Sequence, residues 1–168
     1  HVLVQAVNHA NTRSDSHRID LVVAGDGPLR SEIEALAVSL GIDDRVHFTG
    51  LVDRKRVYEI LSEIDIYAMP SRWEGFSNAA VEALGAGNPC LFSDIDPFYI
   101  PYRGVALFHR LDDVADLADK LVDLAANPDQ RERYGMKGRQ LVEQQYTLEY
   151  VASEYADLYA ELLSGSSD

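Results

Sequence analysis

Two glutamates, Glu74 and Glu82, stand eight positions apart in the segment PSRWEGFSNAAVEALGAGNP (residues 70–89). Glu74 lies in a loop beside Gly75, and Glu82 lies in a nearly continuous apolar run that is expected to form a buried helix over residues 78–86. A buried carboxylate needs a partner, because an unpaired buried charge is costly and takes up a proton instead. Sugar hydroxyls are suitable partners, since they donate hydrogen bonds to carboxylates.

The residues between these two carboxylates are suited to binding an anion. Gly75 permits close approach to the backbone, and the N–H groups of Phe76, Ser77 and Asn78 open the expected helix. Free N–H groups and the helix dipole make such a helix start suitable for a diphosphate. The alternative is that the loop carboxylate is simply solvated and the helical carboxylate is paired within the protein. The combination of both carboxylates, the glycine and the helix start favours a ligand-binding site over this alternative.

Apolar strand-like runs alternate with helical patterns along the chain, which predicts βαβ units and a parallel sheet with helices on both faces. Strands are expected at 19–24, 46–49, 66–69, 90–92 and 105–108, and helices at 1–10, 29–40, 54–64, 78–86, 114–126, 130–145 and 148–163. In such sheets the ligand crevice lies at the carboxyl ends of the strands. The glycine-rich turn GDGP (residues 25–28) and the two-glutamate segment both fall there.

One domain is expected over residues 1–163, followed by a disordered tail at 164–168. The helix at 1–10 resembles the helix of a βαβ unit whose preceding strand is missing, so the chain is expected to be a fragment of a longer protein. Gly41 and Gly87 are expected to end two of the helices, and Ser77 or Asn78 to cap another.

Composition excludes several classes of protein. The net charge of −13 over 168 residues repels phosphate backbones, which argues against a nucleic-acid partner. The single cysteine, Cys90, excludes an internal disulfide and a cysteine-based metal cluster. No apolar run approaches the roughly 20 residues of a membrane-spanning helix. A cytoplasmic protein is expected, with peripheral association at a membrane as an alternative for the full-length protein.

Other candidate residues have simpler interpretations. Cys90 is expected to be a small buried hydrophobe, and the five histidines show no metal-ligand spacing. His109, at a strand end, is more simply a structural residue than a ligand-facing one. Trp73 could line the crevice or pack on the surface. The Tyr, Leu and Ala residues repeated over 150–162 indicate a packing face, which could dock on another domain of the intact protein.

The order GDGP, VHFTGLV and PSRWEGFSNAAVEALGAGNPCLFSD resembles the carboxyl-terminal domain of retaining GT-B glycosyltransferases of the family-4 type (glycosyl transferases group 1). The resemblance covers residues 21–142 and includes the pair of glutamates separated by seven residues. It implies a Rossmann-like α/β domain, one half of a GT-B fold, that binds a nucleotide-diphosphate sugar. A glycan or lipid-linked acceptor would bind through a missing N-terminal domain.

The resemblance also implies roles for individual residues. Glu74 would contact the hydroxyls of the donor sugar and act in catalysis, and Glu82 would contact the ribose. The remaining donor-binding residues would be Gly25 at the crevice, Leu51 and Val52 against the base, and Gly75, Phe76, Ser77 and Asn78 at the phosphates or the sugar. No metal ion and no other cofactor are expected, because cationic groups serve the diphosphate in this family.

The sequence departs from the family pattern in two places. In this family an Arg and a Lys just before the first helix of the domain neutralise the diphosphate, and this sequence does not include such a pair before that helix. In addition, IDPFYIPY (residues 95–102) stands where the family frequently has a Gly-Gly-x-x-Glu stretch. The chain alone is therefore expected to be inactive as a hexosyltransferase. A nucleotide-sugar epimerase of the same fold is an alternative. A non-enzymatic receiver-like module is another, although the clustered acids and the downstream lysine of such modules are missing.

Overall fold

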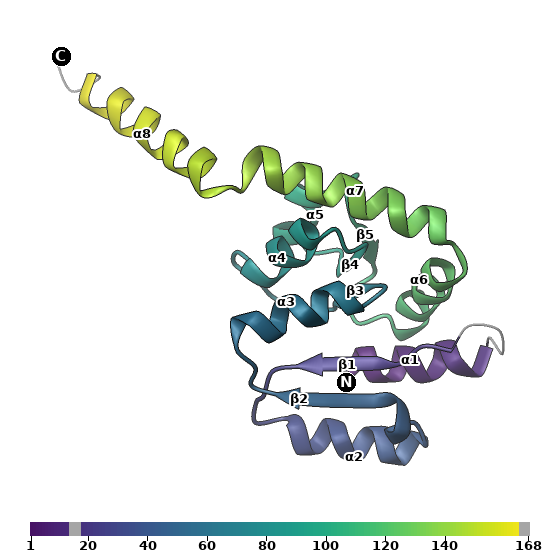
Figure 1. Cartoon of the computed structure of the whole chain (residues 1–168). Coiled ribbons are helices and arrows are strands. Elements are labelled where there is room, and N and C mark those ends of the chain that lie inside the picture. The colour runs from purple at the N-terminus through teal and green to yellow at the C-terminus, as the bar shows by residue number, and fades with distance from the viewer. Residues whose placement is uncertain (14–17, 165–168) are drawn as a thin grey trace.

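The computed structural model describes residues 1–13 and 18–164 (Figure 1). The strands are β1 (Leu21–Ala24), β2 (Val46–Gly50), β3 (Tyr67–Met69), β4 (Cys90–Ser93) and β5 (Leu107–His109). The helices are α1 (Val2–Arg13), α2 (Arg30–Leu40), α3 (Arg54–Glu63), α4 (Asn78–Ala86), α5 (Asp96–Tyr102), α6 (Val114–Ala126), α7 (Pro128–Gln145) and α8 (Leu148–Ser164), with a 3₁₀ turn at Asp43–Arg45. The predicted α/β class is confirmed.

The strands form two parallel sheets. β1 pairs with β2, and β3, β4 and β5 pair in that order. The register places Leu21 opposite Val46, Tyr67 opposite Cys90 and Leu91 opposite Leu107. The carboxyl ends of both sheets face the same edge. Arg54 follows β2 and Glu82 belongs to α4, which follows β3, and the two side chains are close enough to interact electrostatically. The loops that follow the strands therefore converge, as in other α/β ligand sites.

Strand β4 lies at the centre of the core. Leu91 packs with α1 and α6, in a cluster that includes Leu117. Cys90 and Phe92 point the opposite way and pack with residues of α3, α4 and α5. The rings of Phe92 and Phe98 are stacked, with 4.7 Å between their centroids. Every residue of β4 is buried, as expected of a strand in a parallel sheet that helices cover on both faces.

Local sequence signals set the ends of the helices. The Ser77 side chain caps α4, and Gly87 ends it in the left-handed conformation at a φ of 85°. Gly41 ends α2 in the same way, at a φ of 68°. These predictions are therefore confirmed. A further glycine controls packing, since a Cβ atom at Gly135 of α7 would lie 2.2 Å from the carbonyl oxygen of Gly87. Close contact between α7 and the end of α4 thus requires glycine at this position.

The structure differs from the expectation in the region between β4 and α6. Residues 96–102 form α5, which the sequence pattern did not suggest because Pro97 and Pro101 are poor helix formers. Pro97 stands at the start of the helix, where its missing N–H costs nothing. The last strand covers 107–109 rather than the expected 105–108, since its pairing with β4 begins at Leu107.

Helix α4 is only partly buried, which corrects the expectation of a fully buried helix. Ala80, Ala83 and Leu84 are buried, whereas Ala79 is exposed and Glu82 is half-buried. Small apolar side chains such as alanine are tolerated on an exposed surface. The apolar composition of residues 78–86 therefore does not require the whole helix to be buried. The exposed side faces the edge where the strand-following loops meet.

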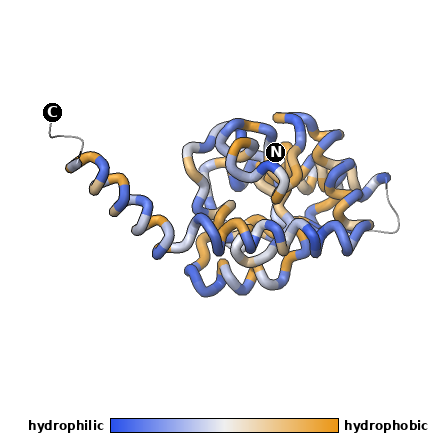
Figure 2. The backbone as a smooth tube through the Cα atoms, turned by 90° about the horizontal axis from the view of Figure 1, so that it is seen from above, coloured by the Kyte–Doolittle hydropathy of each residue, from blue (hydrophilic) through white to orange (hydrophobic). Residues whose placement is uncertain are grey.

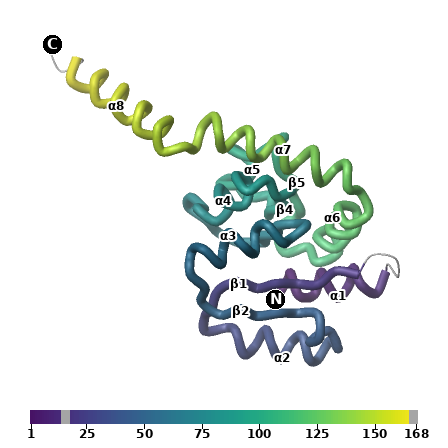
Figure 3. Tube along the Cα trace, in the orientation of Figure 1, coloured from purple at the N-terminus to yellow at the C-terminus, as the bar shows by residue number. Residues whose placement is uncertain are grey.

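Helix α8 projects away from the body of the molecule (Figures 1 and 3). Every residue of this helix is exposed, including Tyr155, Leu158 and Tyr159, so the predicted packing face is not covered within the described residues. Figure 2 shows hydrophobic positions along the whole projecting helix. The helix includes Ser164, which the sequence pattern assigned to the tail, and residues 165–168 lie outside the described part.

Candidate functional site

The loop between β3 and α4 holds Glu74 beside the carboxyl edge of the strands. The Ser71 hydroxyl donates a hydrogen bond of 2.9 Å to Glu74 Oε1, and the carboxylate is half-buried. Arg72 Nε lies 2.9 Å from Asp112 Oδ1, which connects this loop to the turn after β5. Trp73 is 84% exposed, so it lines no closed part of the site in this chain. Glu74 is thus held by its own loop while its remaining lone pairs stay available.

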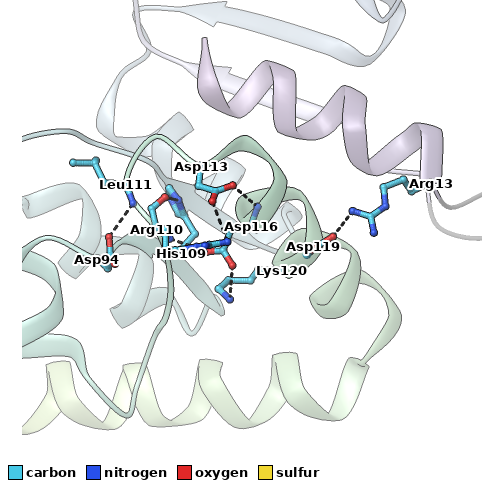
Figure 4. A network of polar contacts seen from close by, with 9 residues as sticks. All are labelled: Arg13, Asp94, His109, Arg110, Leu111, Asp113, Asp116, Asp119 and Lys120. Carbon is cyan, nitrogen blue, oxygen red and sulfur yellow. Dashed lines mark hydrogen bonds and ion pairs between the residues drawn. The ribbon is translucent and has the colours of Figure 1, made fainter.

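The turn after β5 is fixed by a network of polar contacts (Figure 4). The N–H of Leu111 donates to Asp94 Oδ1 at 2.9 Å, and the N–H of Arg110 donates to Asp116 Oδ2 at 2.7 Å. Asp113 caps α6 by accepting from the Asp116 N–H. Hydrogen bonds from Arg110 and Lys120, with the charges of both, hold the pKa of the Asp116 carboxyl below its ordinary value despite the opposing effect of desolvation. The network joins the loops after β4 and β5 into one wall.

His109 is buried under this wall and has partners on both ring nitrogens. Nδ1 lies 2.9 Å from the Arg110 carbonyl, which can only accept, so Nδ1 donates. Nε2 then accepts from the Ser93 hydroxyl at 3.4 Å. His109 therefore links the ends of β4 and β5 and does not face the open edge, which agrees with the structural interpretation of the sequence.

The start of α4 presents backbone N–H groups to the same edge. The buried Ser77 hydroxyl accepts from the Ala80 N–H at 3.2 Å and lies 3.5 Å from the Met69 sulfur, so the Ser77 side chain is already engaged. The other first-turn amides have no acceptor one turn earlier, as at any helix start. Phe76 and Asn78 are exposed beside them. A Cβ atom on Gly75 would meet nothing within 4 Å. The expected close backbone passage at Gly75 is therefore not imposed by protein neighbours.

Replacing Ser77 by alanine is expected to lower the free energy of unfolding by about 1 kcal/mol, because α4 loses its N-terminal cap. Asn127→Ala provides a matched control, since Asn127 caps α7 by accepting from Gln130 at 3.0 Å. Both losses are measurable by urea unfolding. Only Ser77→Ala should also weaken binding of a nucleoside diphosphate, since it loosens the helix start at the site. Equal binding by the two variants would contradict a ligand at the start of α4.

Glu82 lies on the half-exposed side of α4 and has a charged neighbour that the sequence reasoning missed. Arg54 Nε and Nη2 lie 3.1 and 3.0 Å from the Tyr58 hydroxyl. This hydrogen bond raises the pKa of Arg54, and the negative charge of Glu82 adds to the effect. The spacing of four residues between Arg54 and Tyr58 on one helix is the only sequence signal for the arrangement. Glu82 is therefore neither fully buried nor isolated.

Tyr67 of β3 is within electrostatic range of both glutamates, while its hydroxyl lies 3.7 Å from the Met69 sulfur. Burial, with smaller electrostatic contributions from Cys90, Glu74 and Glu82, raises the pKa of its phenol to about 12. Both carboxylates thus influence one neutral phenol group electrostatically. Tyr67 was not singled out from the sequence because a tyrosine in a strand is ordinarily a packing residue.

The turn after β1 meets the end of β2 on the other side of this edge. The Gly25 N–H donates to the Gly50 carbonyl at 3.0 Å, and Gly25 has a φ of 123°, which only glycine adopts readily. Leu51 is 84% exposed and Val52 is half-buried, just before α3. The predicted residues Gly25, Leu51 and Val52 therefore lie at the carboxyl ends of β1 and β2, while Glu74 follows β3.

Two further observations concern the described residues, 1–13 and 18–164. No group of three or more His, Cys, Asp or Glu residues in them is arranged to hold a metal ion. No helix in them is both long enough and apolar enough to cross a bilayer.

Residues 1–127 match the family described as "Glycosyl transferases group 1". The chain belongs to the group 1 glycosyltransferases. This glycosyltransferase chain is 29% identical over 163 residues to N-acetyl-alpha-D-glucosaminyl L-malate synthase of Bacillus anthracis, covering 96% of the chain and 42% of that protein. It is 30% identical over 141 residues to the lipopolysaccharide core biosynthesis glycosyltransferase LpsD of Rhizobium meliloti, covering 83% of the chain and 40% of that protein. The glycosyltransferase chain thus spans about two fifths of the length of these relatives.

Solved structures share the fold. Sucrose-phosphate synthase from Thermosynechococcus elongatus superposes with a TM-score of 0.81 at 25% identity. The superposition covers 97% of the glycosyltransferase chain and 43% of the synthase. Anabaena HepE, solved in complex with UDP and glucose, gives a TM-score of 0.82 at 15% identity. The superposition covers 93% of the glycosyltransferase chain and 44% of HepE. The predicted membership of the group 1 glycosyltransferases and the predicted GT-B type of fold are therefore confirmed.

Proposed function

We propose that this chain is the donor-binding part of a retaining, family-4 type glycosyltransferase that uses a nucleotide-diphosphate sugar. The observation that supports this most is the placement of Glu74 and Glu82. Glu74 lies in the loop before α4 and Glu82 lies just over one turn into the helix, so the helix start falls between them in the sequence, and both influence the phenol of Tyr67. A carboxylate on each side of a helix start suits a ligand with hydroxyls at both ends and phosphates between them.

Different residues of the proposed site would contact different parts of the donor. Leu51 and Val52 would contact the base, and Glu82 would accept hydrogen bonds from the ribose hydroxyls. The amides of Phe76, Ser77 and Asn78 would hold the phosphates. Open space around the Cβ positions of Gly25 and Gly75 leaves room for this approach. Glu74, in the loop before the helix, would then face the sugar.

Arg54 adds a positive charge near the ribose end of the proposed site. Its guanidinium is positioned by the Tyr58 hydroxyl, so the donor nitrogens have a defined direction. Binding of the diphosphate would also use cationic groups from the rest of the full-length protein. No metal ion or other cofactor is part of this proposal.

In this proposal the reaction depends on positioning and electrostatics. As the bond between the sugar and the diphosphate breaks, positive charge develops on the sugar and negative charge on the leaving group. The Glu74 carboxylate would orient and stabilise the cationic sugar. The start of α4, with its free amides and helix dipole, would stabilise the departing phosphate. The hydroxyl of Ser71 keeps the carboxylate of Glu74 in place at 2.9 Å.

The acceptor, a glycan or a lipid-linked molecule, would bind through the part of the full-length protein beyond this chain. The relatives are more than twice as long as their matched segment, which leaves room for an acceptor domain. The exposed apolar side chains of α8 would pack on that domain. The 168-residue chain alone is then expected to bind donor weakly and to transfer no sugar. We propose a cytoplasmic location for the enzyme, with peripheral attachment to a membrane as the alternative.

A panel of nucleoside diphosphates and nucleotide sugars tests the proposed function. At least one of them should raise the melting temperature of the full-length enzyme, and the matching nucleotide sugar should yield a glycoside with the configuration of the donor retained. Conversion of the nucleotide sugar into its epimer without an acceptor would support the epimerase alternative. No binding by any member of the panel would contradict the proposed donor site. Transfer by the 168-residue chain alone would contradict the assignment of acceptor binding to another domain.

A further inference from the structure

The loop that carries Glu74 has few contacts with the rest of the molecule. Within the described residues, one polar side-chain contact leaves the segment 70–76, and this is the ion pair between Arg72 Nε and Asp112 Oδ1 at 2.9 Å. The hydrogen bond from Ser71 to Glu74 stays inside the loop. The position of the Glu74 carboxylate relative to the rest of the site therefore depends on the anchor that Arg72 provides.

A second anchor holds the loop after Glu74. The ring of Phe76 lies 6.1 Å from the ring of Tyr146, measured between centroids, and Ser77 caps α4. Between the two anchors, a Cβ atom on Gly75 would meet nothing within 4 Å, so packing does not fix this part of the loop. Without the ion pair, the loop would be held only at its helical end.

Asp112 stands at a position where glycine is the usual residue. Among the described residues it is the only non-glycine with a positive φ, which is 59°. The Asp113 N–H donates to the Arg110 carbonyl at 3.0 Å, so residues 110–113 form a β-turn with the positive φ at its third position. Turns with a positive φ at that position alone favour glycine, and another residue there costs free energy. What the aspartate adds is a carboxylate, and this carboxylate binds Arg72.

The turn is fixed from below by the wall after β4 and β5 (Figure 4). The N–H of Leu111 donates to Asp94 Oδ1 at 2.9 Å, and the N–H of Arg110 donates to Asp116 Oδ2 at 2.7 Å. A positive φ in a residue other than glycine persists only where the surroundings hold it in place. The ion pair thus ties a loosely packed loop to a fixed part of the molecule.

Stability does not account for this arrangement. The Arg72 and Asp112 side chains are 74% and 45% exposed, and exposed ion pairs contribute little to stability because water and salt screen them. We propose that Arg72 and Asp112 are positioning residues, which anchor the loop so that the Glu74 carboxylate faces the donor sugar. This inference rests on the proposed catalytic role of Glu74. A weak anchor is sufficient, because a misplacement of about 1 Å can lower a rate by about 10²-fold.

The test uses Asp112→Gly and Arg72→Met in the full-length enzyme. Glycine adopts the positive φ without strain and removes the carboxylate, so the melting temperature should change little. Turnover is expected to fall by about tenfold in each variant, with unchanged affinity for the nucleoside diphosphate. Arg72→Lys keeps the positive charge and should recover part of the turnover. The control, Arg45→Met, breaks a pair with Asp20 at 3.0 Å at the amino ends of β1 and β2 and should leave turnover unchanged.

Two further measurements separate positioning from a purely structural role. Combined with Glu74→Gln, Arg72→Met should lower turnover no further, because it acts through that carboxylate. Trp73 is the only tryptophan of the 168-residue chain, so its fluorescence anisotropy reports the mobility of the loop independently of activity. This anisotropy should fall in Arg72→Met and in Asp112→Gly, and it should stay unchanged in Arg45→Met.

The outcomes distinguish this proposal from the proposed function. Full turnover in Arg72→Met or in Asp112→Gly would overturn the positioning role, and so would an added loss in the Glu74→Gln background or an unchanged anisotropy of Trp73. An equal loss of turnover in the control would overturn it as well. Intact turnover in Glu74→Gln would reject the proposed catalytic role and the positioning role with it. A loss in Glu74→Gln together with full turnover in Arg72→Met would overturn the positioning role alone.

Discussion

Replacing Glu74 by glutamine is expected to lower kcat of the full-length enzyme by about 10²-fold or more, as for other losses of one preorganised electrostatic group. The amide of glutamine can still accept the hydrogen bond from Ser71, so the loop should keep its geometry. What disappears is the negative charge, which matters most when the sugar becomes cationic. The loss should therefore appear in the transition state and not in the ground state.

The experiment on Glu74→Gln needs two measurements on the full-length enzyme, turnover and calorimetric binding of the bare nucleoside diphosphate. We expect turnover to fall while affinity for the diphosphate stays nearly unchanged. Glu132→Gln, an exposed carboxylate of α7, is a suitable control and should leave both unchanged. Intact turnover in Glu74→Gln would show that the carboxylate has no catalytic role, and equal losses in turnover and affinity would assign it to binding instead.

The second large effect is expected for Glu82→Gln, which should weaken binding of the nucleotide by about 1.5–3 kcal/mol, the range for a hydrogen bond to a charged group. Because the substitution is nearly isosteric and Glu82 is only half-buried, the melting temperature should change little. Arg54 keeps its hydrogen bonds to Tyr58 in this variant, so the local helix should remain in place.

Glu59→Gln is the matched control for Glu82→Gln. Glu59 lies on α3 and pairs with Arg56 at 3.0 Å on the surface, away from the start of α4. Its replacement should leave nucleotide affinity unchanged. Unaltered affinity in Glu82→Gln together with a lower melting temperature would mean that Glu82 serves the fold through its interaction with Arg54, and that the ribose is held elsewhere.

Much of this architecture could be predicted from sequence because the strongest signals are local. Gly41 and Gly87 end their helices in the left-handed conformation, which is disfavoured for other residues, and Ser77 supplies the cap of α4. The spacing between Glu74 and Glu82 places both near Tyr67, as the loop-and-helix pattern indicates. Such features need no knowledge of which distant segments meet.

The features that could not be predicted depend on tertiary neighbours. An apolar sequence in α4 suggested full burial, but coverage is decided by α3 and α7, and Ala79 is left exposed. Arg54 was missed because its approach to Glu82 joins segments from different sheets. Helix α5 was missed because its two prolines lower the local helical signal, while packing of Phe98 and Tyr102 against Phe92 holds it.

The division of roles between the two carboxylates is tested most directly by one calorimetric series. Binding of the same nucleoside diphosphate is measured for the full-length enzyme, Glu74→Gln and Glu82→Gln under identical conditions. If Glu82 contacts the ribose and Glu74 the sugar, the affinity of Glu74→Gln equals that of the unmodified enzyme, and the affinity of Glu82→Gln falls by about tenfold or more. Unchanged affinity in Glu82→Gln, or a loss confined to Glu74→Gln, would contradict this account of the site.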